Sequence, residues 1–131
     1  MSKSLKFAFV FAVSALTVAA LALIAWHRFD SWAVENHQKA TTRELASWEQ
    51  DFSHIRNKEE AIRAVDMLRY IQDYYVPGPG YRSDSTTESA LQAQRQKTVS
   101  TIARALEQFT GERYGEDVDK WEAWRDGQRR Q

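Results

Sequence analysis

The hydrophobic and polar positions of the chain follow two patterns with a sharp boundary between them. Phe7–Trp26 is a continuous apolar segment without a charged residue. As a helix with a rise of about 1.5 Å per residue it would be about 30 Å long, the thickness of the hydrocarbon core of a bilayer. Lys3 and Lys6 precede the segment, and His27 and Arg28 end it. The pattern predicts one N-terminal transmembrane helix.

A cleaved signal peptide is the alternative to a membrane anchor. Ala20-Leu21-Ala22 matches the small-x-small pattern of cleavage sites. However, the apolar run is longer than the usual stretch of about 7–15 residues, and the candidate site lies inside it. These features favour an uncleaved signal anchor, with the N-terminus inside the cell and the rest of the chain outside. The basic residues that flank the segment discriminate little between the two orientations.

Small residues recur within the apolar segment at alternating spacings of four and three. They are Ala8, Ala12, Ala15, Ala19 and Ala22. This spacing places them on one seam, along which two helices can approach closely in lipid. Because alanine is frequent in the segment, some regularity is also expected by chance. Self-association of the transmembrane helix through this seam is therefore one hypothesis, beside that of a monomeric helix.

The chain after the apolar segment carries helical periodicity. No proline or glycine occurs between Asp30 and Arg56. Apolar residues recur there at spacings of three, four and three, at Leu45, Trp48, Phe52 and Ile55. This spacing describes one face of a helix. We predict a helical stalk that continues from the membrane, with a break near Thr41 and Thr42 as an open alternative. Its apolar stripe is expected to pack on the chain's own domain.

Two helices separated by a loop follow the stalk. Asn57, with Glu60 three residues later, has the arrangement of a helix N-cap, and the helix should run to about Tyr75. Val76–Thr87 contains two proline–glycine pairs and is predicted to be a loop. Ser85–Glu88 matches a capping box for the next helix. The apolar face of that helix would carry Leu91, Val99, Ile102, Leu106 and Phe109.

The C-terminal segment predicts two bends and a short last helix. Gly111 follows Phe109, where a left-handed helix cap favours glycine, and Gly115 makes a second bend. Asp117 is the expected N-cap of a helix over 118–126. Trp121 and Trp124 lie on one face of this helix and are expected to fold back onto the 102–109 face.

The segment 106–124, LEQFTGERYGEDVDKWEAW, resembles the closing unit of bacterial helical-repeat proteins of the HEAT-like kind. In that family a helix ends in Thr-Gly, a turn with an aromatic residue and a second glycine follows, and a W-x-x-W helix caps the array. The resemblance implies an α-hairpin architecture and a binding or scaffolding role. Stacked repeats need about three units, and the sequence contains no second copy. The resemblance therefore implies a terminal-type unit used alone.

Together these patterns predict an all-α protein with a single transmembrane helix, a stalk and a small α-hairpin bundle closed by a Trp-bearing helix. The predicted boundaries are a basic N-terminus at 1–6, the transmembrane helix at 7–28, the stalk at 29–56, the helical domain at 57–126 and a polar tail at 127–131. The chain has 18 basic and 18 acidic residues, so it shows no excess of positive charge for nucleic acid. The absence of cysteine excludes disulfides, thiolate catalysis and cysteine-ligated zinc.

Catalytic and metal-binding patterns are not found in the sequence. His27, His37 and His54 do not have the i,i+4 spacing of a metal site, and no phosphate-binding loop, dinucleotide fingerprint or nucleophile elbow occurs. Acidic residues gather at 59–60 and 116–119, where helices are predicted to begin and negative charge is favoured by the helix dipole. We therefore expect no enzyme activity, no cofactor and no metal.

The predicted loop carries the candidate residues for recognition of a partner, namely Tyr75, Tyr81 and Arg82. Tyrosine and arginine are enriched at interface hot spots, although tyrosines beside a Pro-Gly loop often pack the loop down instead. The leading hypothesis is a non-catalytic protein-interaction module of the bacterial envelope, anchored in the inner membrane, with another protein or itself as partner. A spacer without a specific partner and an exported soluble domain are the alternatives.

Overall fold

The chain folds into four helices. The computed structural model describes residues 3–74, 76, 78 and 80–130. The helices are α1 (Lys3–Asp51), α2 (Lys58–Tyr74), α3 (Ser85–Thr110) and α4 (Val118–Arg129). No strand occurs among the residues that the structure describes. The all-α class predicted from the sequence is confirmed.

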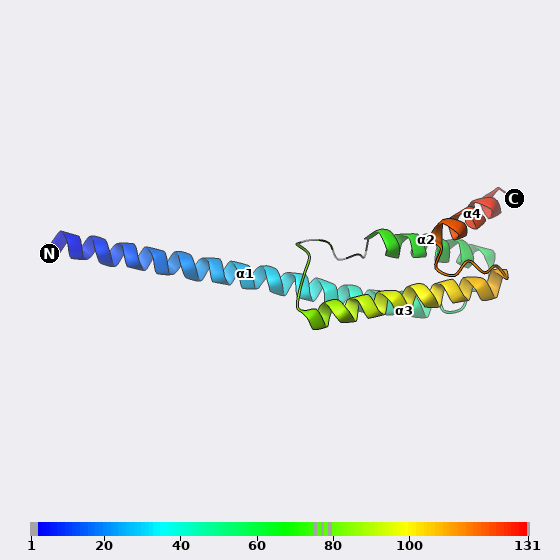
Figure 1. Cartoon of the computed structure of the whole chain (residues 1–131), viewed down its shortest axis with the longest axis horizontal. Helices are drawn as coiled ribbons and strands as arrows, with labels where there is room; N and C mark the ends of the chain where they lie inside the picture. Colours follow the sequence, from blue (N-terminus) through cyan, green and yellow to red (C-terminus); the bar gives the residue numbers. More distant parts are fainter. Residues whose placement is uncertain (1–2, 75, 77, 79, 131) are drawn as a thin grey trace.

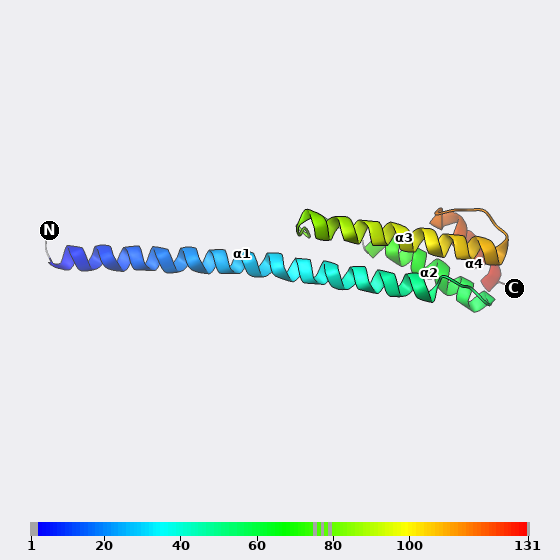
Figure 2. The same cartoon turned by 90° about the horizontal axis from the view of Figure 1, so that it is seen from below.

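Helix α1 is 49 residues long and has two different environments along its length. Its N-terminal half extends away from the other helices, and its C-terminal half lies beside them (Figures 1 and 2). The side chains of residues 4–32 are all exposed. Because this stretch is apolar, α1 is long and apolar enough to cross a membrane near the N-terminus.

The break that was considered near Thr41 and Thr42 does not occur. Helix α1 passes through both residues, and their hydroxyl groups donate to the carbonyl oxygens of His37 at 3.0 Å and Gln38 at 2.9 Å. These bonds satisfy the hydroxyl groups within the helix, so the two threonines do not interrupt it. The helix ends at Asp51, and a short bend leads to α2.

The start of α2 agrees with the sequence prediction. Asn57 Oδ1 accepts a hydrogen bond from the backbone N–H of Glu60 at 2.9 Å. In return, Glu60 Oε2 accepts from the backbone N–H of Arg56 at 2.9 Å. These two bonds satisfy donors that a helix start otherwise leaves unpaired, which explains why the chain turns into α2 here.

Helix α3 is the central element of the packed part of the chain. It lies against α1 and α2, and α4 lies against α2. Helices α1 and α3 run in the same direction, whereas α2 runs in the opposite direction (Figures 1 and 2). The core between the helices consists of Leu45, Ala61, Ala64, Val65, Leu68, Ile71, Leu91, Val99, Ile102, Leu106, Val118 and Trp121. Trp48, Phe52 and Ile55 pack against this core, so the apolar stripe of the stalk does pack on its own domain.

Helix α3 begins one residue earlier than its predicted capping box. The N-cap is Asp84 rather than Ser85, and the Asp84 side chain accepts from the backbone N–H of Thr87 at 2.9 Å. Glu88 Oε1 accepts from the backbone N–H of Ser83 at 2.9 Å. The carboxylate at position 84 accepts from both the N–H and the hydroxyl of Thr87, which a serine hydroxyl at position 85 does not do.

The turn between α3 and α4 follows the predicted glycines. Gly111 has a φ of 80° and donates its N–H to the carbonyl oxygen of Glu107 at 2.9 Å, as a left-handed helix cap requires. Gly115 also has a positive φ, of 56°. Asp117 caps α4 by accepting from the backbone N–H of Lys120 at 3.2 Å. These three predictions are confirmed.

Two predictions about the C-terminal half are wrong. Helix α4 continues to Arg129, so residues 127–129 are its last turn rather than part of a polar tail. Phe109, assigned to the apolar face of α3, is 39% exposed, because the core ends at Leu106 on that helix.

Candidate functional site

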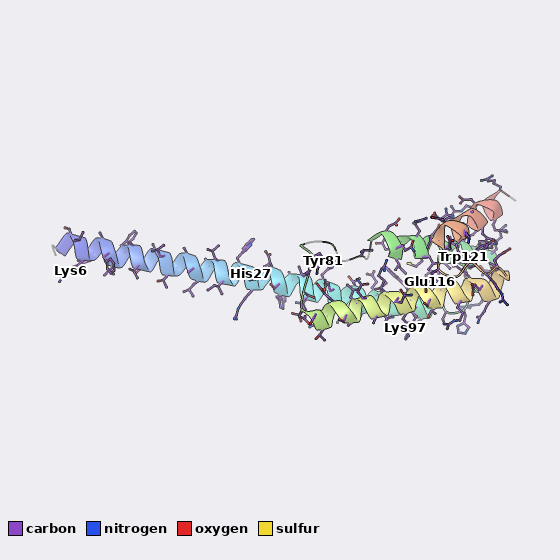
Figure 3. The ribbon with its side chains drawn as sticks, viewed as in Figure 1. Lys6, His27, Tyr81, Lys97, Glu116 and Trp121 are labelled. Carbon is purple, nitrogen blue, oxygen red and sulfur yellow. The ribbon has the colours of Figure 1, made fainter. Side chains whose placement is uncertain are left out.

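The loop before α3 is fastened to α1. Tyr81 is half-buried, and its ring meets the ring of His37 edge to face, with centroids 5.4 Å apart. The Tyr81 hydroxyl hydrogen-bonds with Nδ1 of His37. The Tyr81 carbonyl oxygen accepts from Nε2 of Gln38 at 3.2 Å. Tyr81 therefore holds the loop against α1, where Figure 3 labels it beyond His27.

The three predicted partner-binding residues have different surroundings. Arg82 is exposed next to the fastened Tyr81. Tyr75 lies outside the residues that the structure describes. The segment between α2 and α3, to which Tyr81 and Arg82 belong, lies at the end of the packed helices that faces the apolar half of α1 (Figure 1). Tyr81 presents only part of its ring, and Arg82 has the more accessible side chain.

Gln38 is the polar centre of this attachment, and the sequence analysis did not identify it. Its side chain is fully buried on α1. Its Oε1 accepts from the hydroxyl of Ser83, while Nε2 bonds to Tyr81 as described. A signal was present, because Gln38 and Thr41 continue the spacing of the apolar stripe toward the N-terminus. A polar residue in such a stripe marks a place where a buried partner must satisfy it.

A second group of polar contacts joins α1 to α3. The hydroxyl of the buried Thr98 donates to the carbonyl oxygen of Leu45 at 3.0 Å. Gln94 Nε2 donates to Glu49 Oε2 at 2.8 Å, and Lys97 Nζ lies 3.2 Å from Glu49 Oε1. The hydrogen bond from Gln94 lowers the pKa of the Glu49 carboxyl, against the opposite effect of burial, and Lys97 acts in the same direction. These contacts fix the register of the two helices.

Charged side chains join α4 to α2. Arg69 on α2 bonds to Asp119 and, at 2.6 Å, to Glu122. Arg125 on α4 lies 2.6 Å from Asp66 Oδ1, and Arg129 lies 3.1 Å from Asp66 Oδ2. The bond from Arg69 is the main cause that lowers the pKa of the Glu122 carboxyl. The Arg129 contact lies in the last turn of α4, within the predicted tail.

The residues predicted to be structural meet around Trp121. Its indole is fully buried, and Nε1–H donates to the carbonyl oxygen of Gly115 at 2.8 Å. Tyr114 and Trp124 contact the indole edge to face, with centroid distances of 4.8 Å and 6.2 Å. Trp124 is only partly buried. The bend at Gly115 therefore both turns the chain and binds the side chain that closes the core.

A small groove lies at the bend between α1 and α2. Its apolar lining comes from Trp48, Phe52, Ile55 and Met67, and charged or polar side chains complete it. Its volume is about 280 Å³. Pockets for small molecules usually have about 300–1,000 Å³, so the volume of this groove lies at the lower end of that range. The sequence analysis identified Trp48, Phe52 and Ile55 as an apolar face but did not predict the groove.

No group of three or more potential metal ligands occurs in the described part of the chain. His54 Nδ1 is 2.9 Å from the hydroxyl of Ser53, its own neighbour in sequence. His37 is engaged with Tyr81. His37 and His54 therefore have separate partners, one distant in sequence and one adjacent.

The alanine seam lies on the free half of α1. Ala8, Ala12, Ala15, Ala19 and Ala22 are all exposed. None of the other helices that the structure describes lies beside this half of α1 (Figure 2). Self-association through the seam remains a prediction.

Comparison of the chain with protein-family models, with curated proteins and with solved structures finds no match.

Proposed function

We propose that this chain is a membrane-anchored, non-catalytic helical module that binds another protein, or a second copy of itself, at the bacterial cytoplasmic membrane. One observation carries this proposal. The exposed apolar stretch and the first helix of the packed domain are a single helix, α1, without a hinge between them. A domain joined to a membrane helix in this way is held at a fixed distance and in a fixed orientation. Such a geometry suits the presentation of a surface to a partner.

The orientation and architecture belong to the same proposal. The short basic N-terminus favours insertion with the packed helices on the periplasmic side. The small α-hairpin bundle and the HEAT-like closing segment support a binding or scaffolding role, because helical-repeat units act by contact rather than by chemistry. Arg82 and the exposed part of Tyr81 are the surface that we assign to the partner.

A spacer without a specific partner is the second candidate. It is favoured by the free stretch of α1 between Trp26 and Gln38, which carries no packed helix and sets a distance of about 18 Å at about 1.5 Å per residue. An exported soluble domain is the third candidate and requires cleavage near Ala22. The three candidates differ in membrane attachment and in partner binding, so two experiments separate them.

The first experiment tests the anchor. Membranes from cells that express the full chain are washed with alkaline carbonate, and the mass of the retained protein is measured. We expect the intact chain in the pellet. A shorter protein that begins near Leu23 and is released into the wash would show that the segment is a signal peptide and would refute the proposal.

The second experiment tests the partner surface in living cells. A photo-crosslinking amino acid replaces Arg82 in one variant and Gln92, an exposed residue on α3, in a control variant. We expect a discrete crosslinked product at position 82 that is absent at position 92, and we expect Tyr81→Ala to weaken it. Absence of any product at position 82, with the anchor intact, would favour the spacer.

A further inference from the structure

Exposed aromatic side chains gather where the apolar half of α1 ends, with Trp26 before Arg28 and with Phe29 and Trp32 after it. Trp26, Phe29 and Trp32 are 68%, 58% and 60% exposed. The rings of Phe29 and Trp32 contact each other, with centroids 5.8 Å apart. We call residues 27–36 the neck, since they connect the apolar segment to the first buried residue, Gln38. The neck is helical throughout and has no proline or glycine.

Phe29 and Trp32 lie on the face of α1 that points away from the bundle, and Trp26 lies at the edge of this face. At about 100° per residue, Trp26, Phe29 and Trp32 fall within an arc of about 120°. Phe29 precedes the buried Gln38 by nine residues, and Trp32 precedes the buried Thr41 by nine residues. Nine residues are about two and a half turns, so each aromatic residue lies on the side opposite its buried counterpart.

The other side of the neck is polar from its first residue. His27 and Ser31 lie about 160° from Phe29 around the helix, and both are exposed. The Ser31 hydroxyl donates to the carbonyl oxygen of His27 at 3.0 Å. On the aromatic side, the charged Arg28 lies about 40° from Trp32 around the helix, and Asn36 is the next polar residue after it. The exposed aromatic surface on this side reaches Trp32, about 9 Å beyond Trp26 at about 1.5 Å per residue.

We propose that α1 leans toward its aromatic face in the membrane, so that this face of the neck contacts the lipid headgroup layer and the bundle, on the upper side, is held clear of the lipid. The inference rests on the proposed membrane anchor. Membrane helices are tilted by about 20° on average, and interfacial aromatic anchors set the tilt and rotation. Aromatic rings favour the headgroup layer. An upright helix would place the aromatic Trp32 and the polar Ser31 at about the same depth, whereas a tilted helix places Trp32 closer to the lipid.

The consequence for the packed helices follows from the stiffness of α1. Because Gln38, Thr41 and Leu45 fix the bundle on one side of the same helix, a lean toward the opposite side raises the bundle above the lipid surface. The surface that carries Arg82 then faces the aqueous phase rather than the headgroups.

The chain has no cysteine, so single spin labels can be introduced along the neck without background. Each residue of 27–36 is replaced in turn by labelled cysteine in the full chain, reconstituted in vesicles of phosphatidylethanolamine and phosphatidylglycerol. Label depth is measured from the relative accessibility to oxygen and to a water-soluble nickel complex. We expect depth to oscillate with the helical period, with labels at 29 and 33 several-fold more accessible to oxygen than labels at 27 and 31.

A matched pair of variants tests the cause of the oscillation. Phe29→Ser combined with Trp32→Ser should flatten it, whereas His27→Ser on the opposite face should leave it unchanged. A depth that decreases steadily from 27 to 36 would mean an upright helix and would overturn the inference. Protection of positions 29 and 33 from both reagents would also overturn it, because a second copy or another protein would then cover the face. Failure of the chain to enter the vesicle fraction would refute the anchor itself.

Discussion

Trp121 offers the sharpest test of the packed domain. It is the largest of the fully buried side chains that the structure describes. Its indole belongs to the same core cluster as Leu68, Ile102 and Leu106 and donates to the carbonyl oxygen of Gly115. Trp121→Ala would leave a cavity at the point where α4 closes on the other helices. The substitution should therefore destabilise the whole bundle and not only the closing helix.

The expected magnitude follows from burial. Truncation of a buried Trp to Ala costs about 3–5 kcal/mol, as the lost transfer energy and the cavity add. Loss of the hydrogen bond adds little, because Gly115 is exposed and its carbonyl oxygen can bond to water. A domain of this size has a free energy of unfolding of about 5–15 kcal/mol. The substitution would thus raise the opening equilibrium constant by about two to four orders of magnitude.

Hydrogen exchange measured by mass spectrometry on the full chain in detergent micelles reports this opening. We expect amides of α2, α3 and α4 to lose protection together in Trp121→Ala. The control is Trp32→Ala, since Trp32 is exposed on the neck and should leave the bundle unchanged. Trp124→Ala should fall between the two, because Trp124 is partly buried.

Two results would refute this reasoning. Equal protection in Trp121→Ala and Trp32→Ala would mean that the indole does not stabilise the core. Loss of protection confined to α4 would mean that the closing helix is attached to the bundle without completing its core.

Three further predictions concern single interactions. Asp84→Ala should increase hydrogen exchange in the first turn of α3, whereas Ser85→Ala should not, because Asp84 is the N-cap. Glu122→Gln should lower the melting temperature at neutral pH. Arg69 lowers the pKa of the Glu122 carboxyl below its ordinary value of 4.5. The stabilisation by this contact is therefore present above pH 4.5 and is lost as the pH falls through the lowered pKa. The melting temperatures of wild type and variant should accordingly converge in acid. Gly111→Ala should cost about 1–2 kcal/mol in urea unfolding, because its φ of 80° strains an L-residue while its surroundings leave room for a methyl group.

Local signals in the sequence predicted the parts of the fold that depend on neighbours in the chain. The Asn57 cap, the glycine at 111 and the Asp117 cap each need only contacts within a few residues. The helical spacing of Leu45, Trp48 and Phe52 likewise indicated the packed face of α1. These features were predictable because their physical cause lies within one or two helical turns.

The remaining errors come from contacts that a single segment does not contain. The helical structure of residues 127–129 is accompanied by an ion pair from Arg129 to Asp66, 63 positions away in the chain. Phe109 is exposed because the core on α3 ends at Leu106, a limit that the other helices set. The error at the start of α3 is instead local, because the Asp84 carboxylate caps the helix in place of the neighbouring Ser85 hydroxyl.

The candidate partner surface was less predictable than the fold. Tyr81 could be selected from its type and its place beside a Pro-Gly loop, but its contacts with His37 and Gln38 join positions more than 40 residues apart. The groove near Trp48 likewise exists only because α1 and α2 meet at the bend. A sequence pattern identifies residues that can bind, whereas tertiary contacts decide which part of each residue stays accessible.

The two halves of α1 have different surroundings, so their side chains meet different requirements. In the packed half, the buried polar groups have partners: Gln38 bonds to Ser83 of the loop, and the carbonyl oxygen of Leu45 accepts from Thr98 on α3. In the free half, apolar side chains face outward on every side, as in a helix that crosses a membrane. In the neck, aromatic side chains and the bundle lie on different faces of the helix rather than at different positions along its axis. Under the proposed anchor, the bundle determines which face of α1 is free, and the lipid determines the direction in which α1 tilts. The orientation of the bundle and the tilt of the membrane helix are therefore coupled.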